Sequence, residues 1–239
     1  MNRLVSIRQL GRSAIRTGRN LLLSQGCAVC NRPQNQTFCP DCQVQLQDLV
    51  RGFEGWTPSD KHPLLIGTLA PYSGPMRQAL RALKYDSRPD VGHALGVALG
   101  KQWRKHGLQT KRADPLYVLP IPLHRHRQVQ RGYNQANVIA QSFCRVSGLP
   151  LLAKGLIRIE DTLPQYQLGL KARQENLLNA FQVGQPLRQL GKQLGTMPRV
   201  LLIDDIYTTG ATAKSAADIL RRSQVSVVGM IAVAKSVGA

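Results

Sequence analysis

The sequence predicts an α/β protein, built on a mainly parallel sheet flanked by helices and preceded by a small cysteine-rich module. Two observations lead to this prediction. From residue 64 to residue 234, apolar runs of strand length alternate with stretches of helical periodicity, which is typical of a parallel sheet covered by helices on both faces. Before them, two Cys-x-x-Cys pairs lie within residues 27–42. We expect the module at 1–55 and the α/β domain at 56–239.

The first 24 residues interleave arginines with apolar residues at approximately helical spacing. This pattern predicts a basic amphipathic helix. A secretory signal requires an apolar stretch of about 7–15 residues, whereas Leu21, Leu22 and Leu23 form the only solid apolar run here. We expect a cytoplasmic protein, and contact of this helix with a membrane surface or with nucleic acid is the weaker alternative.

The four cysteines of the module, Cys27, Cys30, Cys39 and Cys42, form two short knuckles separated by eight residues. Two such pairs can supply the four thiolates of a closed, structural zinc site. Disulfides are the alternative, but nothing in the sequence indicates export to an oxidising compartment. A catalytic zinc is disfavoured because all four coordination positions are filled. We interpret the fifth cysteine, Cys144, as a buried structural thiol.

The elements after the module follow from periodicity and from turn-forming residues. Residues 51–63 are rich in turn formers without a clear period, so the module should end there. The predicted elements are a strand at 64–70, helices at 76–84 and 93–106, a strand at 116–123, a basic loop, a helix at 135–147, short strands within 151–159 and at 180–183, a strand at 200–206, a helix at 213–222 and a strand at 225–234. Residues 184–197, rich in Gly and Gln, receive no assignment. Ligands should gather at the carboxyl ends of the strands.

Composition limits the possible partners. The 239 residues include 32 Lys and Arg against 13 Asp and Glu, a formal charge of +19, and such a field concentrates phosphorylated ligands and nucleic acid. A merely solvated basic surface is the alternative. No window approaches the roughly 18 unbroken apolar residues of a membrane-spanning helix, so we expect a soluble protein.

The strongest functional signal is an apolar strand that ends in two carboxylates and runs through small hydroxyl residues into a helix. Its residues are Asp204, Asp205, Thr208, Thr209, Gly210, Ala211 and Thr212. Glycine permits close backbone approach, and the N–H groups at a helix N-terminus bind a phosphate dianion. The carboxylates would repel that phosphate, so we expect them to accept hydrogen bonds from ribose hydroxyls. An ordinary capped helix with two solvated Asp residues is the alternative.

At these residues the chain resembles the 5-phosphoribosyl-1-pyrophosphate (PRPP) loop of type I phosphoribosyltransferases. Over most of residues 25–235 it resembles the ComF/GntX family, which joins a short zinc site to such a domain. The stretches that carry the resemblance are the two cysteine pairs, 72–77 leading to Lys84, 120–123 with 131–135, and 158–181. The resemblance implies PRPP and Mg²⁺ as ligands, and transfer of a phosphoribosyl group to an acceptor that the sequence does not identify.

The resemblance also implies roles for three arginines. The segment after the strand at 116–123 corresponds to the pyrophosphate loop, in which Arg131 is the residue we expect to bind pyrophosphate and Arg125 and Arg127 have a solvated loop as their alternative. Arg158 and Arg173 lie in a polar stretch that corresponds to a lid over the reacting ribose carbon; a simple exposed loop is the alternative. Arg131, Arg158 and Arg173 are therefore the candidate catalytic residues.

A different class of function remains open. ComF relatives are associated with natural competence, so the same fold and charge suit a non-catalytic protein that handles single-stranded DNA or contacts competence proteins. The basic residues from Lys101 to Arg131 face one acid, Asp114, and any DNA contact should rest on phosphates because aromatic residues make up only 5% of the chain. The oligomeric state stays open.

Overall fold

The computed structural model describes residues 26–59, 62–106, 115–159 and 180–236. In chain order its elements are α2 (Pro40–Asp48), β1 (Glu54–Ser59), β2 (His62–Pro71), α3 (Gly74–Tyr85), α4 (Pro89–His106), β3 (Leu116–Pro120), α5 (Arg125–Arg131), α6 (Gln135–Ser147), β4 (Leu156–Arg158), β5 (Phe181–Val183), α8 (Gln185–Leu194), β6 (Arg199–Tyr207), α9 (Ala211–Arg222) and β7 (Ser226–Lys235). The helix expected within residues 1–24 lies outside the described part of the chain.

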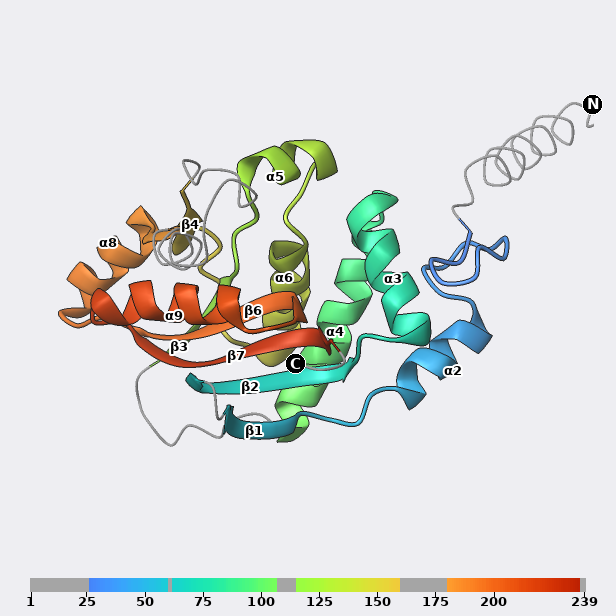
Figure 1. The fold of residues 1–239 in the computed structure, drawn as a ribbon, viewed down its shortest axis with the longest axis horizontal. Helices are drawn as coiled ribbons and strands as arrows, with labels where there is room; N and C mark the ends of the chain where they lie inside the picture. The colour runs from blue at the N-terminus through green and yellow to red at the C-terminus, as the bar shows by residue number, and fades with distance from the viewer. Residues whose placement is uncertain (1–25, 60–61, 107–114, 160–179, 237–239) are drawn as a thin grey trace, which may run out of the picture.

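A five-stranded sheet in the order β1-β2-β7-β6-β3 forms the centre of the molecule (Figure 1). The four strands from β2 to β3 are parallel, and β1 pairs antiparallel with β2 at one edge. In the register of β3 with β6, Pro120 lies beside Ile203, so the loops after these two strands leave the same edge of the sheet. The predicted mainly parallel, helix-flanked sheet is confirmed.

Alternate residues of the central strand β6 face two separate hydrophobic clusters. Leu201 and Ile203 pack in a cluster with α3, α4 and α6, whereas Val200 and Leu202 pack on the other face with α9, α8 and the small β4–β5 hairpin. Because side chains alternate across a strand, an apolar run such as 200–203 belongs to a strand buried on both faces. The central strand therefore holds the carboxyl edge of the sheet rigidly.

Three glycines at intervals of four residues let α4 lie close against α6. A side-chain carbon added at Gly96 would lie 2.3 Å from the carbonyl oxygen of Ile139, and one added at Gly92 or Gly100 would lie 2.8 Å or 2.7 Å from a valine of α6. Residues four apart share one face of a helix, so the three glycines form one continuous strip. The two helices meet along it with their backbones in near contact.

The cysteine-rich module is packed onto the α/β domain. Ala28 and Leu46 of the module belong to the same hydrophobic cluster as the helices on one face of the sheet. Arg88, in the turn before α4, is buried: its Nη1 donates to the carbonyl oxygen of Gly26 over 2.8 Å, while Nε and Nη2 donate to Asp90. One guanidinium group thus ties the start of the module to the start of α4.

The structure corrects two expectations about local structure and places a helix in a stretch that received no assignment. The turn-rich segment 51–63 contains strand β1, residues 184–197 contain helix α8, and the expected basic loop contains the short helix α5. In α5 the Nδ1 of His124 accepts from the N–H of His126, and Gly132, at a φ of 77°, ends the helix. The loop was expected because the sequence of α5 has no apolar period. In the structure no residue of α5 is buried. The helix is instead bounded by two capping residues, His124 at its start and Gly132 at its end.

Candidate functional site

The two carboxylates expected at the site lie at the carboxyl end of β6, between the strands β7 and β3. Asp205 is buried, with 8% of its surface exposed, and its Oδ2 lies 2.9 Å from the Nζ of Lys84 at the end of α3. Asp204 is half-buried and its Oδ1 accepts a hydrogen bond from the N–H of Asp205 over 2.8 Å. The two acids therefore have different partners, although they are adjacent.

The surroundings of Asp204 change the pKa of its carboxyl group. Burial, followed by the negative charge of Asp205, raises the pKa of the Asp204 carboxyl well above its ordinary value, and Lys84 opposes this rise. Two like charges on adjacent residues cannot both ionise without cost. The pair thus consists of a carboxylate neutralised by an ammonium group and a second carboxyl that ionises less readily.

The turn after β6 leads directly into α9. Thr208 and Thr209 are exposed, and Gly210 has a φ of 78°, a left-handed conformation that favours glycine. A side-chain carbon at Gly210 would lie 2.5 Å from the hydroxyl oxygen of Tyr207. Gly210 is the residue that caps α9 and makes no side-chain capping bond. The hydroxyl oxygen of Thr209 accepts a long hydrogen bond, 3.5 Å, from the N–H of Ala211, the first residue of α9. The other N–H groups at the start of a helix have no intrahelical partner, and such groups can bind an anion.

The loop after β3 closes against the same edge of the sheet. The N–H of Ile121 donates to the carbonyl oxygen of Ile203 over 2.8 Å, and Asn134 bridges Ile121 to the start of α6 by donating to its carbonyl oxygen and accepting from the N–H of Ala136. The hydroxyl of Tyr133 donates to the carbonyl oxygen of Leu83 in α3. The end of α3, the β3–α6 loop and the end of β6 are thereby held together.

Of the three candidate catalytic arginines, Arg131 is the last residue of α5, in the segment between β3 and α6. Its guanidinium carbon is 5.3 Å from the centre of the Tyr85 ring, and Nη1 donates to Gln135 over 3.1 Å. Tyr85 follows Lys84, so Arg131 and the cation that pairs with Asp205 are both positioned at the last turn of α3. Both interactions leave donors of the guanidinium group available, because it carries five N–H groups.

Arg158 lies at the end of β4, with its guanidinium carbon 5.4 Å from the centre of the Phe181 ring. Burial, followed by the positive charge of Arg127, lowers the pKa of Arg158, and the charge of Asp204 opposes this. Its Nε is buried and has no partner within the described structure. Arg158 therefore lies within electrostatic reach of both α5 and the Asp pair, while Arg173 falls outside the described residues.

Together these groups make an edge with both signs of charge. Carboxyls lie on the central strand, the N-terminus of α9 follows them, and arginines come from α5 and β4. Such an edge can bind a ligand that carries hydroxyl groups and phosphate groups at once, because carboxylates accept from hydroxyls and cations bind phosphate. The ion pair of Lys84 with Asp205 is a part of this site that the sequence analysis did not assign. The two residues lie far apart in the sequence, and a lysine in the last turn of a helix carries no local signal of its partner.

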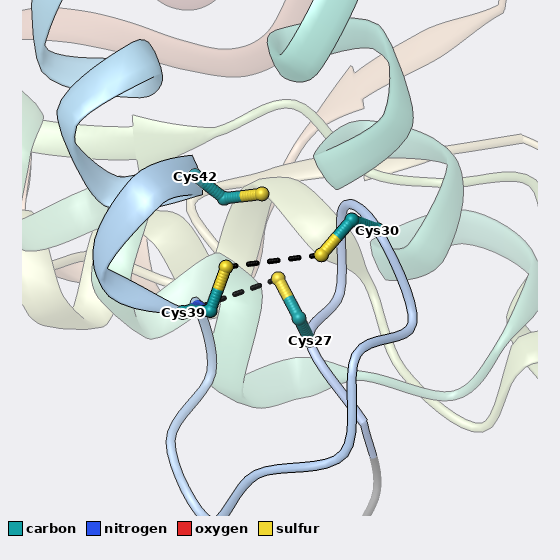
Figure 2. Close-up of side chains that lie close together, drawn as sticks. All are labelled: Cys27, Cys30, Cys39 and Cys42. Atoms are coloured by element: carbon teal, nitrogen blue, oxygen red, sulfur yellow. Dashed lines mark hydrogen bonds between the residues drawn. The ribbon is translucent and has the colours of Figure 1, made fainter.

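The four cysteines of the module form a second site. Their sulfur atoms all lie within 4.8 Å of one another, and Figure 2 shows the four side chains pointing toward one centre from the hairpin and from α2. The segment called the cysteine hairpin is residues 26–39, before α2. Sγ of Cys30 and Sγ of Cys39 are 3.7 Å apart, and the N–H of Cys39 points to Sγ of Cys27 over 3.3 Å. Zinc–sulfur bonds of about 2.3 Å in a tetrahedron place sulfur atoms about 3.8 Å apart. The donor set and its spacing fit a structural zinc ion.

The thiols of this cluster differ in acidity. Burial opposes ionisation of Cys27, but hydrogen bonds from the backbone N–H groups of Cys39, Cys30 and Val29 outweigh it and lower the pKa of the thiol to about 6. Burial and the neighbouring thiols raise the pKa of Cys42. Backbone N–H groups that point at a sulfur atom are a common feature of thiolate sites, since they stabilise negative charge. Cys144 packs against the core, where burial raises its pKa to about 12.

Fold and sites together define a class: an α/β protein with a mainly parallel sheet, an acidic strand end followed by a glycine turn into a helix, and a four-cysteine module. Comparison with known proteins narrows this class. The chain is 27% identical over 218 residues to competence protein F of Haemophilus influenzae, covering 88% of this chain and 90% of that protein. It is 28% identical over 210 residues to DNA utilization protein YhgH of Escherichia coli, covering 84% and 86%.

A third relative is competence protein ComFC of Bacillus subtilis, 27% identical over 199 residues that cover 81% of this chain and 70% of that protein. The resemblance to ComF proteins expected from the sequence is thus confirmed. No family model matches the chain. Among solved structures, an adenine phosphoribosyltransferase of Leishmania tarentolae aligns with a TM-score of 0.35 and 20% identity, over 62% of this chain and 58% of that chain.

Membrane insertion was not expected from the sequence. Among the helices of the described residues, none is both long enough and apolar enough to cross a membrane.

Proposed function

We propose that the carboxyl edge of the sheet binds PRPP together with Mg²⁺, and that the protein transfers the phosphoribosyl group to an acceptor that is not identified. The observation that supports this most is the junction of β6 and α9, where Asp204 and Asp205 precede a left-handed glycine at the N-terminus of a helix. The 5-phosphate would lie on residues 208–212. The ribose hydroxyls would donate to the two acids.

In this proposal the reaction breaks the bond between ribose C1 and the pyrophosphate oxygen, whose electron pair leaves with pyrophosphate, and a nitrogen nucleophile bonds to C1 and loses its proton. The protein needs to position the ligand and stabilise charge, and it needs no nucleophilic side chain. Arg131, Arg158 and Arg173 would act on the pyrophosphate side. Carboxylate oxygens are the donors that Mg²⁺ prefers, so Asp204 and Asp205 fit it; when bound, it would neutralise charge on the leaving group.

Lys84 has a defined part in the proposal. Because it pairs with Asp205 on one carboxylate oxygen, it fixes the orientation of that carboxylate and leaves the other oxygen for a ligand. Asp204 commits one oxygen to the N–H of Asp205 in the same way. Each acid therefore presents one oriented acceptor, which suits a pair of neighbouring ribose hydroxyls.

The test is calorimetric titration of the protein with PRPP and Mg²⁺. Replacing both acids by Asn removes charge-assisted bonds worth about 1.5–3 kcal/mol each, so affinity should fall by roughly two to four powers of ten. Since Lys84 loses its partner in that variant, Thr212→Val, which removes one hydroxyl donor on the phosphate side, serves as an independent variant. Circular dichroism verifies folding. Unchanged affinity in both folded variants would show that PRPP does not bind here.

A second candidate function is the handling of single-stranded DNA, with or without catalysis. The relatives named competence protein F, ComFC and DNA utilization protein YhgH support it, as does the formal charge of +19. Binding should tolerate any sequence and weaken steeply with salt, because phosphate contacts release counterions. An oligonucleotide titration at two salt concentrations measures this separately from PRPP, so either function can fail without the other.

A further inference from the structure

A cleft of about 930 Å³ lies between the cysteine-rich module and α4, and no part of the PRPP proposal uses it. Its apolar floor includes Leu46 of α2, Leu69 of β2 and Leu95 of α4, which all belong to the main core cluster. The floor is therefore set by the packing of the module on the domain. A cleft of this size can hold a flat ring system and its substituents.

One wall of the cleft comes from the cysteine hairpin and α2. Phe38, directly before Cys39, is half-buried and is the aromatic residue among those that line the cleft within the described structure. Gln43 and Gln47 lie one helical turn apart on α2, are exposed and line the same wall. An aromatic ring with amide groups beside it can stack a flat heterocycle and hydrogen-bond its edge.

The opposite wall is the last part of α4, and it is cationic. Lys101, Arg104 and Lys105 line the cleft and are exposed, and the lining residues of the described structure include no Asp or Glu. These cations are distinct from the basic residues of α5. In Figure 1, α5 lies at the top of the view, whereas α4 runs down to end at the bottom, below β1. The basic stretch 101–131, continuous in sequence, is divided in space.

We propose that this cleft binds single-stranded nucleic acid, with a base stacked on Phe38 and the adjacent phosphates on Lys101 and Lys105. A duplex is a poor fit because its bases are already stacked, and an acidic peptide would use the cations but would leave the aromatic wall unused. The proposal rests on the second candidate function, for which it supplies a site, and it is independent of PRPP. Stacking on one aromatic ring and phosphate contacts to two lysines give sequence-tolerant, salt-dependent binding.

The experiment measures fluorescence anisotropy of labelled dT15 with the full chain at several salt concentrations. Phe38→Leu, which keeps apolar bulk but removes the ring, should weaken binding about tenfold, within the range for loss of one stacked base. Lys101→Gln with Lys105→Gln should lower the slope of log affinity against log salt by about 1.4, for two phosphate contacts on a single strand. The matched control is Lys154→Gln with Lys192→Gln, two exposed lysines elsewhere, for which the slope should stay near wild type.

The outcomes separate the cleft from the function. If wild type binds dT15 and both cleft variants bind equally well, the second candidate function stands and the cleft is not its site. If wild type binds neither dT15 nor rU15, the second candidate function and the cleft proposal both fall. If rU15 binds more tightly than dT15 and the cleft variants lose this binding, the single strand that the cleft binds is RNA.

A labelled oligoglutamate peptide that binds with the same dependence on Phe38 overturns the assignment to nucleic acid. Equimolar zinc in each variant verifies that the hairpin is intact.

Discussion

At the scale of single residues, the adjacent carboxyl groups of Asp204 and Asp205 differ in their interaction partners and in their ease of ionisation. Asp205 has a cation at 2.9 Å, whereas Asp204 has a backbone N–H and a like charge beside it. A ligand that brings magnesium or hydroxyl donors therefore meets one acid that is paired with a lysine and one acid whose pKa is raised.

The raised pKa of Asp204 predicts how stability depends on pH. In the unfolded chain this acid loses its proton near an ordinary pKa of about 3.9, while the folded protein retains the proton to higher pH. The unfolded state therefore binds fewer protons in that window, and the free energy of unfolding falls as pH rises through it. Asp204→Asn should flatten this part of the profile, measured by urea denaturation from pH 4 to 8, whereas the exposed control Asp48→Asn should keep it. A parallel wild-type and Asp204→Asn profile would contradict the assignment.

The ion pair of Lys84 with Asp205 predicts strong coupling between the two residues. Their side chains are 17% and 12% exposed, so Lys84→Met leaves a poorly solvated carboxylate and should cost about 2–3 kcal/mol of unfolding free energy, somewhat below the cost for a fully buried pair. Asp205→Asn added to Lys84→Met should recover most of that loss. The measurement is a double-mutant cycle by urea denaturation. Additive single effects would mean that the pair contributes nothing.

At the scale of elements, the turn from β6 into α9 is the most constrained part of the site. Gly210→Ala places a carbon in a left-handed position and 2.5 Å from the hydroxyl of Tyr207. Gly195 is a matched control, since its φ is 67° and nothing lies within 4 Å of an added carbon. Gly210→Ala should cost about 1–3 kcal/mol more than Gly195→Ala, the typical cost of overpacking. Urea denaturation measures both, and Tyr207→Phe should restore part of the difference by removing the hydroxyl. Equal costs would contradict the clash.

Elements with strong local signals were predictable from the sequence. The apolar run 200–206 and the helix 135–147 were both expected, and the structure has β6 at Arg199–Tyr207 and α6 at Gln135–Ser147. Elements without a clear apolar period were missed, namely β1, α2 and α5, and α8 was missed although Leu187, Leu190 and Leu194 are spaced as on one face of a helix. In α8 the signal was hidden by a Gly and Gln composition, yet Leu187 packs fully buried against the sheet. In α8 the leucine spacing was therefore the informative signal, and the glycine and glutamine content obscured it.

The residues of the candidate site that are close in sequence could be predicted, whereas the contacts between distant residues could not. A strand end followed by small hydroxyl residues and glycine is a local pattern, and Asp204, Asp205 and Gly210 lie together because they are close in sequence. Lys84 and Arg158 reach the same edge from elements far away in the sequence, which only the fold can bring together. The four cysteines were predictable because ligand spacing within a short hairpin leaves few other arrangements.

At the scale of the whole molecule, zinc should control whether the module stays on the domain. We expect one zinc per chain, measured by elemental analysis of protein purified without added metal. Chelation should increase hydrogen exchange in residues 26–48 and expose the core contacts of Ala28 and Leu46, because metal supplies much of the folding energy of such a hairpin. Exchange in β6 should change little. Metal-free protein with four reactive thiols and a protected hairpin would contradict the zinc assignment.

The buried guanidinium group of Arg88 bears on how genes of this kind can recombine. It hydrogen-bonds to the carbonyl oxygen of Gly26 on one side and to Asp90 on the other. A fusion that joined residues 26–50 to a foreign sheet would leave that carbonyl without its donor, and the chain that lost them would keep a buried cation with half of its partners. A crossover that carries the segment up to residue 90 as one piece keeps all of these bonds, so breakpoints after the first turn of α4 should cost less stability than breakpoints within residues 51–63.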